Sequence, residues 1–375
     1  QNTIDMAALT RTTAPAFAAK SASVRASKAG RAAPAVASPA IGLSQFSGLR
    51  SQTKALAARS APAQAAVSRR AASTVAMATA PRLGESASSL ISNTKCFIFD
   101  CDGVIWKGDS VIEGVPETLA MLRSAGKQLV FVTNNSTKSR AGYLKKFISL
   151  GLDVKAEEIF SSSFAAAAYL KSIDFKKKVY VVGEVGIQEE FDLAGLDWCG
   201  GENDKGKTID LAPGLFLEHP AEVGAVVVGF DRHINYHKIQ MATLCIRENP
   251  GCLFIGTNPD AVTHLTDAQE WAGNGSMVGA IKGSTGQEPT IVGKPSGFML
   301  DYIAETFGYE RKEICMVGDR LDTDILFGKD GGLTTMLVLS GVTTEETLLS
   351  SSNTITPDFY TNKLPDIMSG APAVV

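Results

Sequence analysis

Short apolar runs alternate with amphipathic stretches from residue 95 onward. An apolar run of roughly 4–8 residues suits a buried strand, and a longer amphipathic stretch suits a helix. The expected strands are 95–99, 128–132, 178–182, 225–230, 252–255, 290–292, 315–317 and 335–339, and the expected helices are 116–125, 139–150, 236–248 and 296–307. This alternation predicts β/α units around a parallel sheet, which places the fold in the α/β class.

The predicted units divide into a core and an insert. Residues 85–163 and 263–375 each carry strand and helix units, so we expect them to form one Rossmann-like core with a parallel sheet. Residues 164–262 lie between them and are long enough for a second, smaller α/β domain. The glycine-rich segment 273–279 lacks the strand–turn–helix setting of a dinucleotide loop, and we expect it to return the chain from the insert to the core.

Residues 1–77 have the composition of an organelle transit peptide. This region is rich in Ala, Ser, Thr and Arg, and residues 1–84 contain 11 Lys or Arg but a single acid, Asp5. It has no apolar stretch long enough for a secretory signal. We expect a disordered segment that directs the protein to the chloroplast stroma, with the mitochondrion as the alternative destination and a plain basic tail as the alternative role.

Charge and hydropathy exclude two classes of protein. The whole chain has 36 basic and 39 acidic residues, so residues 85–375 hold the remaining 25 basic and 38 acidic groups, a net charge of −13. Such an acidic body argues against non-specific nucleic-acid binding, which depends on Lys and Arg at phosphates. No apolar run approaches the roughly 18 residues that a membrane span requires, so we expect no membrane partner.

Polar residues follow the predicted strands at the edge where ligands bind in α/β sheets. The first strand ends in D-C-D-G-V at 100–104, and the second ends in T-N-N-S at 133–136. Later strands lead into G-K-P at 293–295 and G-D-R-L-D-T-D at 318–324. Carboxylates, a hydroxyl, a lysine and glycine-rich turns are therefore predicted to meet at one rim.

Two of these aspartates suit phosphoryl transfer. The Asp100 carboxylate can attack phosphorus as a nucleophile and form an aspartyl-phosphate. Asp102 lies two residues further along, where bending of the backbone can aim its side chain at the leaving oxygen as a general acid, and afterwards at a water molecule as a base. These residue types at this spacing thus favour phosphoryl transfer through an aspartyl-phosphate.

A nucleophilic carboxylate repels an anionic substrate, so a cation is expected at the same rim. Mg²⁺ prefers oxygen ligands, and Asp100, Asp319 and the backbone carbonyl of Asp102 can supply them. The phosphate itself needs donors that offset its charge. The expected substrate-binding residues near the strand ends are Thr133, Asn134, Asn135 and Lys294.

The ordered set D-x-D-G-V, T-N-N, K-P and G-D-x-x-x-T-D resembles the haloacid dehalogenase superfamily of phosphatases, over roughly residues 95–345. The resemblance implies that the second acid, Asp102, marks a phosphatase or phosphomutase. It also implies that Asp324 contacts the residues that bind the metal and so helps to hold them in place. An acid at the start of a helix can also have a purely structural role.

The place of the insert, between T-N-N and K-P, resembles the large cap of the branch that includes phosphoglycolate, pyridoxal phosphate and nitrophenyl phosphatases. It implies a Rossmann-like parallel-sheet core with an inserted α/β cap domain, and a homodimer formed through the cap. His233 matches a histidine of the cap that touches substrate, and the neighbouring Arg232 is a candidate partner for a substrate carboxylate. Both residues could equally belong to an exposed turn.

The branch and the expected plastid address together imply Mg²⁺-dependent hydrolysis of 2-phosphoglycolate, the by-product of ribulose bisphosphate oxygenation, to glycolate and phosphate. Pyridoxal 5′-phosphate is the alternative substrate. An alternative of another class is a non-catalytic protein that binds a metabolite or serves in assembly. A small anionic phosphomonoester is the expected partner in either enzymatic case.

Overall fold

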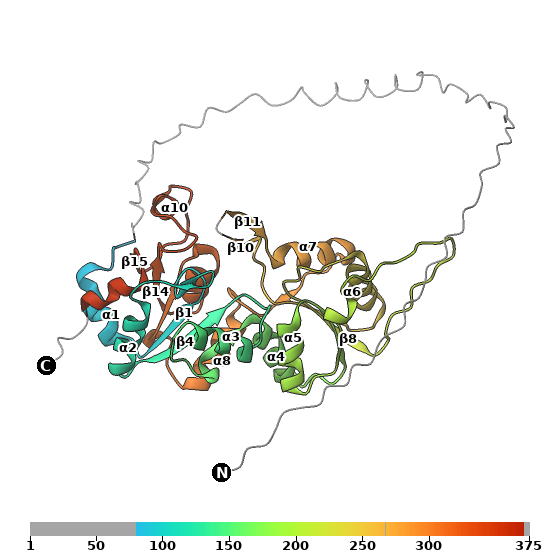
Figure 1. The fold of residues 1–375 in the computed structure, drawn as a ribbon, viewed down its shortest axis with the longest axis horizontal. Helices are drawn as coiled ribbons and strands as arrows, with labels where there is room; N and C mark the ends of the chain where they lie inside the picture. Colours follow the sequence, from blue (N-terminus) through green and yellow to red (C-terminus); the bar gives the residue numbers. More distant parts are fainter. Residues whose placement is uncertain (1–79, 267, 371–375) are drawn as a thin grey trace, which may run out of the picture. The chain divides into compact units, whose positions relative to one another are not determined.

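The computed structural model describes residues 80–266 and 268–370, and the transit peptide expected at 1–77 lies outside the described residues. The described residues form two parallel sheets with helices packed on them (Figure 1). The predicted α/β class is confirmed. None of the helices in the described part combines the length and the apolar character that crossing a membrane demands.

The core sheet has six strands in the order β15-β14-β13-β1-β4-β5, and every neighbouring pair is parallel. Its central strand is fully buried, because apolar side chains leave it on both faces. The strands are β1 (Cys96–Asp100), β4 (Gln128–Thr133), β5 (Ile159–Ser161), β13 (Ile314–Gly318), β14 (Thr334–Val338) and β15 (Phe359–Thr361).

Two apolar clusters cover the faces of the core sheet. On one face, Phe97, Phe99 and Phe131 pack with α1 (Ala87–Asn93), α2 (Val115–Ser124) and α3 (Arg140–Ser149). On the other face, apolar side chains of β1, β4 and β13 pack with α8 (Gly297–Phe307), α9 (Leu326–Asp330) and α4 (Ser162–Ser172). The sheet is thus enclosed by helices, and the loops at its strand ends are left for ligands.

The second sheet has five strands in the order β12-β9-β8-β6-β7, also parallel throughout. Helices α4 and α5 (Val185–Ala194) cover one face, and α6 (Tyr236–Glu248) and α7 (Asn274–Thr285) cover the other. The strands are β6 (Lys178–Val182), β7 (Trp198–Gly200), β8 (Val223–Val228), β9 (Leu253–Gly256) and β12 (Thr290–Ile291).

The two sheets share one apolar cluster. Ile98 and Val130 of the core sheet belong to the same cluster as Val181 and Val227 of the second sheet, with α4 between them. Since α4 follows β5 of the core and precedes β6 of the insert, it is both the connection and part of the shared packing. The insert therefore rests on the core through buried side chains.

Several elements, among them α4, α5, β5 and β7, were not expected from the sequence, and three further segments differ from what was expected of them. The strand expected at 290–292 belongs to the second sheet as β12, because it pairs with β9 and not with a core strand. The segment 273–279 expected as a glycine-rich return begins α7. The strand expected at 335–339 is β14, and a further core strand that was not expected, β15, pairs with it.

Short antiparallel hairpins complete the described strands. One is formed by β2 (Trp106–Lys107) and β3 (Ser110–Val111), directly after β1. The other is formed by β10 (Val262–Thr266) and β11 (Gln269–Ala272), and it was not expected from the sequence. Helix α10 (Glu345–Leu349) follows β14.

Candidate active site

The ends of three adjacent core strands bring the predicted aspartates together. In the sheet, β1 lies between β13 and β4, and all three run in the same direction. Asp100 is the last residue of β1, Thr133 is the last residue of β4, and Asp319 directly follows β13. The rim predicted from the order of the motifs is therefore present in the fold.

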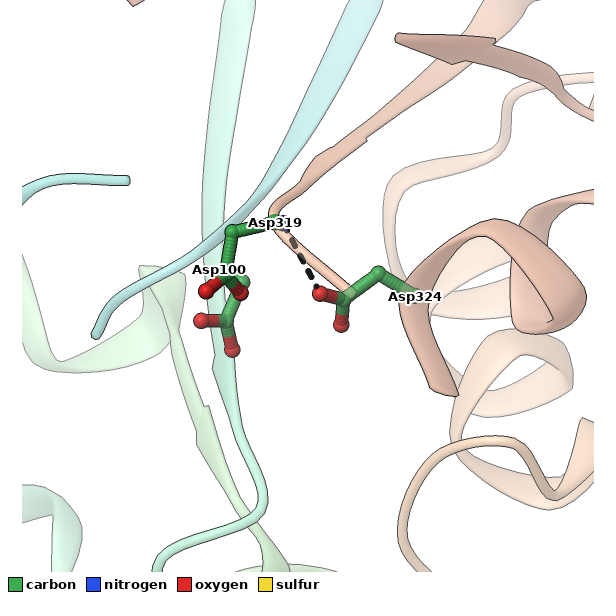
Figure 2. A group of neighbouring side chains, drawn as sticks. All are labelled: Asp100, Asp319 and Asp324. Atoms are coloured by element: carbon green, nitrogen blue, oxygen red, sulfur yellow. Dashed lines mark hydrogen bonds between the residues drawn. The ribbon is translucent and has the colours of Figure 1, made fainter. Parts of the chain in front are cut away.

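Three buried carboxylates gather at this rim. Asp100, Asp319 and Asp324 each offer an oxygen within 4.8 Å of the others, and each side chain belongs to a residue that is at most 8% exposed (Figure 2). Asp324 comes from the short helical turn Leu321–Ile325 that follows β13. Among the described residues, this is the group of acids suited to hold a metal ion.

Backbone amides orient two of these carboxylates. The Asp324 Oδ2 accepts hydrogen bonds of 3.1 Å from the backbone N–H groups of Asp319 and Arg320, the first of which is drawn in Figure 2. The Asp319 Oδ2 accepts a hydrogen bond of 2.7 Å from the backbone N–H of Val342. The loop must come very close here, since a Cβ on Gly341 would lie 1.8 Å from that same oxygen.

Lys294 enters the cluster from the loop after β12. It is 1% exposed, and its ammonium group bonds the Asp100 Oδ1 and lies 2.7 Å from the Asp324 Oδ1. A fully buried lysine requires such partners, because an isolated charge in the interior is very costly. The strand before Lys294 belongs to the second sheet, so the inserted region helps to deliver this side chain to the core.

Burial and mutual repulsion shift the pKa values of this cluster. Burial, together with the nearby Asp324 carboxylate, raises the pKa of Asp319 to about 7. Burial raises the pKa of Asp100 well above its usual range, although Lys294 opposes this. Burial by itself would lower the pKa of Lys294, but the Asp100 and Asp324 carboxylates outweigh burial and raise it, so the ammonium stays charged.

The Asp102 side chain lies apart from the three buried carboxylates. It is exposed, and its Oδ1 accepts a hydrogen bond of 2.8 Å from the indole Nε1 of Trp106. Trp106 is itself fully buried, with its ring 4.9 Å from that of Phe147. Asp102 is therefore held at the open side of the rim, where a side chain can exchange a proton with solvent or substrate.

Asn134 makes different contacts from those expected of a substrate ligand. Its Oδ1 accepts a hydrogen bond of 2.9 Å from the backbone N–H of Lys294, and its Nδ2 donates to the Lys294 carbonyl at 3.0 Å. The Nδ2 also lies 3.1 Å from the Asp260 Oδ1. Both polar atoms of the amide are thus engaged in holding the backbone of Lys294 and the side chain of Asp260.

The neighbouring predicted residues Thr133 and Asn135 stabilise the turn after β4. The Thr133 hydroxyl accepts a hydrogen bond of 3.1 Å from the backbone N–H of Asn135. The Asn135 Oδ1 accepts hydrogen bonds from the backbone N–H and the hydroxyl of Thr137, at 3.0 and 2.7 Å. Thr133 and Asn135 both still line the cavity described below.

His233 and Arg232 lie outside the cavity lining. The His233 residue is exposed, and its backbone N–H bonds the Asp231 carboxylate. Arg232 forms a bidentate pair with Glu184, at 2.8 and 2.7 Å. Neither residue is among those that line the cavity, although Phe230 in the same turn after β8 does line it.

A cavity of about 530 Å³ lies over the carboxylates. Its wall combines the core loops with residues of the inserted region, including Phe230, Asp260 and the β10 strand of the unexpected hairpin. Asp260, in the string T-N-P-D at 257–260, was not expected as a wall residue. The core residues of the wall include Asp100, Asp102, Thr133, Asn134, Asn135, Lys294 and Asp319.

The donor set of the cavity fits a hard divalent cation. Three carboxylates and one ammonium, all buried, leave a formal charge of −2 when every group is ionised. Carboxylate oxygens are the ligands that Mg²⁺ and similar ions prefer. The cluster therefore has the capacity to hold a metal ion, and it includes the Asp324 carboxylate in addition to those of Asp100 and Asp319.

Two family models match the chain. Residues 97–197 match the model described as haloacid dehalogenase-like hydrolase, and residues 291–367 match a second model described as HAD-hydrolase-like. The first match contains Asp100, Asp102 and Thr133, and the second contains Lys294 and Asp319. The two matched segments thus carry all the strand ends that form the rim.

Curated relatives and solved structures agree with these matches. The chain is 66% identical over 293 residues to phosphoglycolate phosphatase 1A, chloroplastic, of Arabidopsis thaliana, which covers 78% of this chain and 81% of that relative. It is 55% identical to phosphoglycolate phosphatase 2 of the same plant, over 77% of this chain and 98% of the relative. The p-nitrophenyl phosphatase from Archaeoglobus fulgidus is a solved structure with 34% identity and a TM-score of 0.64, over 74% of this chain and 98% of that one.

Proposed function

The chain belongs to the haloacid dehalogenase-like hydrolases, and from that premise we propose that it is a phosphatase that converts 2-phosphoglycolate to glycolate and phosphate. The observation that carries the substrate is the identity of 66% over 293 residues with a phosphoglycolate phosphatase. The observation that supports the chemistry is the buried cluster of Asp100, Asp319, Asp324 and Lys294.

Asp100 is the proposed nucleophile. One of its carboxylate oxygens forms a bond to phosphorus while the bond between phosphorus and the glycolate oxygen breaks, which yields an aspartyl-phosphate. The strand end holds Asp100 in the cluster, and Lys294 bonds one of its oxygens. The other oxygen is then the one available for attack.

Asp102 is the proposed general acid and base. In the first step it gives its proton to the departing glycolate oxygen, and in the second it takes a proton from the water that attacks the aspartyl-phosphate. Its hydrogen bond to the Trp106 indole fixes the direction of the carboxyl group while one oxygen remains open. The exposure of Asp102 suits a group that must exchange protons twice in each turnover.

Substrate phosphate oxygens would be bound by the Lys294 ammonium, the Thr133 hydroxyl and the backbone N–H of Asn134. These groups line the same cavity. Donors placed around a phosphoryl group stabilise the charge that develops on it during transfer. The Asn134 side chain contributes by holding Lys294 at both of its backbone polar atoms.

Mg²⁺ is the proposed metal ion. Asp100, Asp319 and Asp324 would hold it, together with the Asp102 carbonyl expected from the sequence. When bound, the ion offsets the charge of the phosphoryl group beside the carboxylates. Glycine is required at 103 and 341, because a Cβ at these positions would lie 2.5 and 1.8 Å from the Asp319 Oδ2 and would displace this carboxylate.

Two further properties follow from the relatives and from the exposed surface. The relative with 66% identity is named as a chloroplastic protein, which supports the chloroplast stroma as the destination of this chain. A homodimer through the inserted region is supported by apolar side chains left on its surface, since Leu211 is 78% and Phe216 is 76% exposed. The mass in solution, measured by light scattering, tests the dimer.

The deciding experiment is a side-by-side measurement of kcat/KM for 2-phosphoglycolate and pyridoxal 5′-phosphate. The competitor is included because the cavity is large enough for a ring substrate. We expect 2-phosphoglycolate to give the higher value, with Mg²⁺ required for both. A higher value for pyridoxal 5′-phosphate would overturn the substrate, and absence of phosphate release from either ester would overturn the enzymatic proposal.

A further inference from the structure

The shape of the cavity does not by itself select a two-carbon acid. A volume of about 530 Å³ falls in the range that accommodates drug-sized ligands. A substrate as small as 2-phosphoglycolate would touch only part of the wall. The feature that distinguishes it from other small phosphate esters is its second anionic group, so selection requires a positive charge at a fixed place in the wall.

Three cationic side chains line the cavity, and two of them are already paired. Lys294 is held by Asp100 and Asp324. Arg320 forms a bidentate pair with Asp322, at 3.1 and 2.9 Å. The third cation, Lys107, makes no ion pair or side-chain hydrogen bond within the part of the chain that the structure describes.

The carboxylates of the wall make such a cation necessary. Besides the three buried acids, Asp102 and Asp260 also line the cavity. A substrate that carries a carboxylate as well as a phosphate would be repelled by all of them. Lys294 serves the phosphate end under the proposed function, so the other end of the substrate needs a separate donor.

The position of Lys107 is fixed by the backbone around the proposed acid. Lys107 follows Trp106 in β2, and Trp106 is bridged to Asp102. The Trp106 carbonyl accepts a hydrogen bond of 2.7 Å from Gly103, and its amide donates to Cys101 at 3.2 Å. Since the Trp106 side chain is fully buried, the residue after it is held at a constant place beside the loop that follows Asp100.

We propose that Lys107 binds the carboxylate of the substrate and makes the enzyme selective for phosphate esters of small carboxylic acids. The inference rests on the proposed function, and it names the residue that recognises the non-reacting end of the ester. The Lys107 ammonium donates a hydrogen bond to the substrate carboxylate. No existing ion pair has to be broken for this contact, because Lys107 forms none among the described residues. Esters without a carboxylate gain nothing from this contact.

The test compares 2-phosphoglycolate with ethyl phosphate, which has the same two-carbon frame without the carboxylate. We expect Lys107→Met to reduce the ratio of their kcat/KM values about 10- to 100-fold, as for loss of a charge-assisted hydrogen bond. Most of the loss should appear in KM for 2-phosphoglycolate, because the carboxylate is bound equally in the ground state and the transition state. Lys107→Arg should retain most of the ratio, because it keeps the charge.

Lys145→Met is the matched control, since Lys145 is exposed on α3 and does not line the cavity. It should leave the ratio within about twofold of the wild-type value, as surface substitutions away from a site do. An unchanged ratio in Lys107→Met, with an unchanged thermal unfolding midpoint, would overturn the inference while the proposed function stands. A wild-type enzyme that hydrolyses both esters equally well would contradict the inference and the proposed substrate together.

Discussion

At the scale of single residues, the two aspartates for which the sequence predicts different tasks lie in different surroundings. Asp100 is buried in the carboxylate cluster, whereas Asp102 is exposed and bonded to Trp106. A nucleophile must be placed against phosphorus, while a general acid must exchange protons with its surroundings. The difference in burial between the two positions matches this division of labour.

Substitutions at these two positions should separate the roles. Asp100→Asn is expected to lower kcat at least about 1000-fold, because an amide cannot form the acyl phosphate. Asp102→Asn should lower kcat about 100- to 10,000-fold through loss of proton transfer, and should leave binding of inorganic phosphate largely intact. Phosphate release and calorimetric titration with phosphate measure the two effects, and normal turnover in Asp100→Asn would exclude it as the nucleophile.

Asn134 provides a second contrast at this scale. In Asn134→Ala, the buried backbone N–H and carbonyl of Lys294 lose their partners, which should cost about 1–3 kcal/mol for each unsatisfied group. We expect a lower unfolding midpoint together with a kcat/KM reduced about 10- to 100-fold, because the Lys294 ammonium loses its fixed position. Asn135→Ala is the control, since within residues 80–266 and 268–370 the Asn135 side chain bonds only Thr137. Equal effects of both changes would contradict a special role for Asn134.

At the scale of elements, an ion pair connects α6 of the inserted region to the turn after β8. The Lys238 ammonium lies 2.6 Å from the Asp231 Oδ2, and both side chains are 0% exposed. Asp231 also accepts a hydrogen bond from the backbone N–H of His233, and so it shapes the turn. Burying two charges is costly, and removal of one partner leaves the other charge without compensation.

Asp231→Ala is therefore expected to destabilise the protein by about 3–5 kcal/mol. The double variant Asp231→Leu with Lys238→Met should recover much of that loss, since two apolar side chains of similar volume replace the pair. Thermal unfolding of both variants measures the difference. If the double variant were less stable than Asp231→Ala, the cost would lie in the shape of the turn and not in the unpaired charge.

Local patterns predicted the elements of the core and the ends of its strands. The runs at Cys96–Phe99 and Leu129–Val132 are apolar on both faces, so strand type and burial followed from composition alone, and Asp100 and Thr133 fell at the rim. The sheet to which β12 belongs was not predictable, because a strand of two residues carries no signal about its neighbour. The role of the Asn134 amide was missed for a similar reason, since its partner Lys294 lies 160 residues away.

At the scale of the whole molecule, the core and the inserted region act on one cavity. Phe230 of the inserted region donates its backbone N–H to the buried hydroxyl of Ser136 in the core, at 3.1 Å. Asn258 donates to the Asn134 carbonyl at 2.7 Å. Together with the shared apolar cluster, these bonds hold the cavity wall of the inserted region against the turn after β4, and we therefore expect binding at the rim to be coupled to the stability of both regions.

Removal of divalent ions should reveal this coupling. Without a cation, the three buried carboxylates retain only Lys294 as a positive partner in the cluster, and their repulsion weakens the joint between the two regions. At a Mg²⁺ concentration about 100 times its dissociation constant, binding to the folded state should contribute about 2.7 kcal/mol. We therefore expect EDTA to abolish phosphate release and to lower the unfolding midpoint, and Mg²⁺ to restore both. Asp319→Asn should abolish the Mg²⁺-dependent shift of the midpoint, because a neutral amide removes one of the three anionic ligands. A shift of wild-type size in that variant would place the ion elsewhere in the molecule.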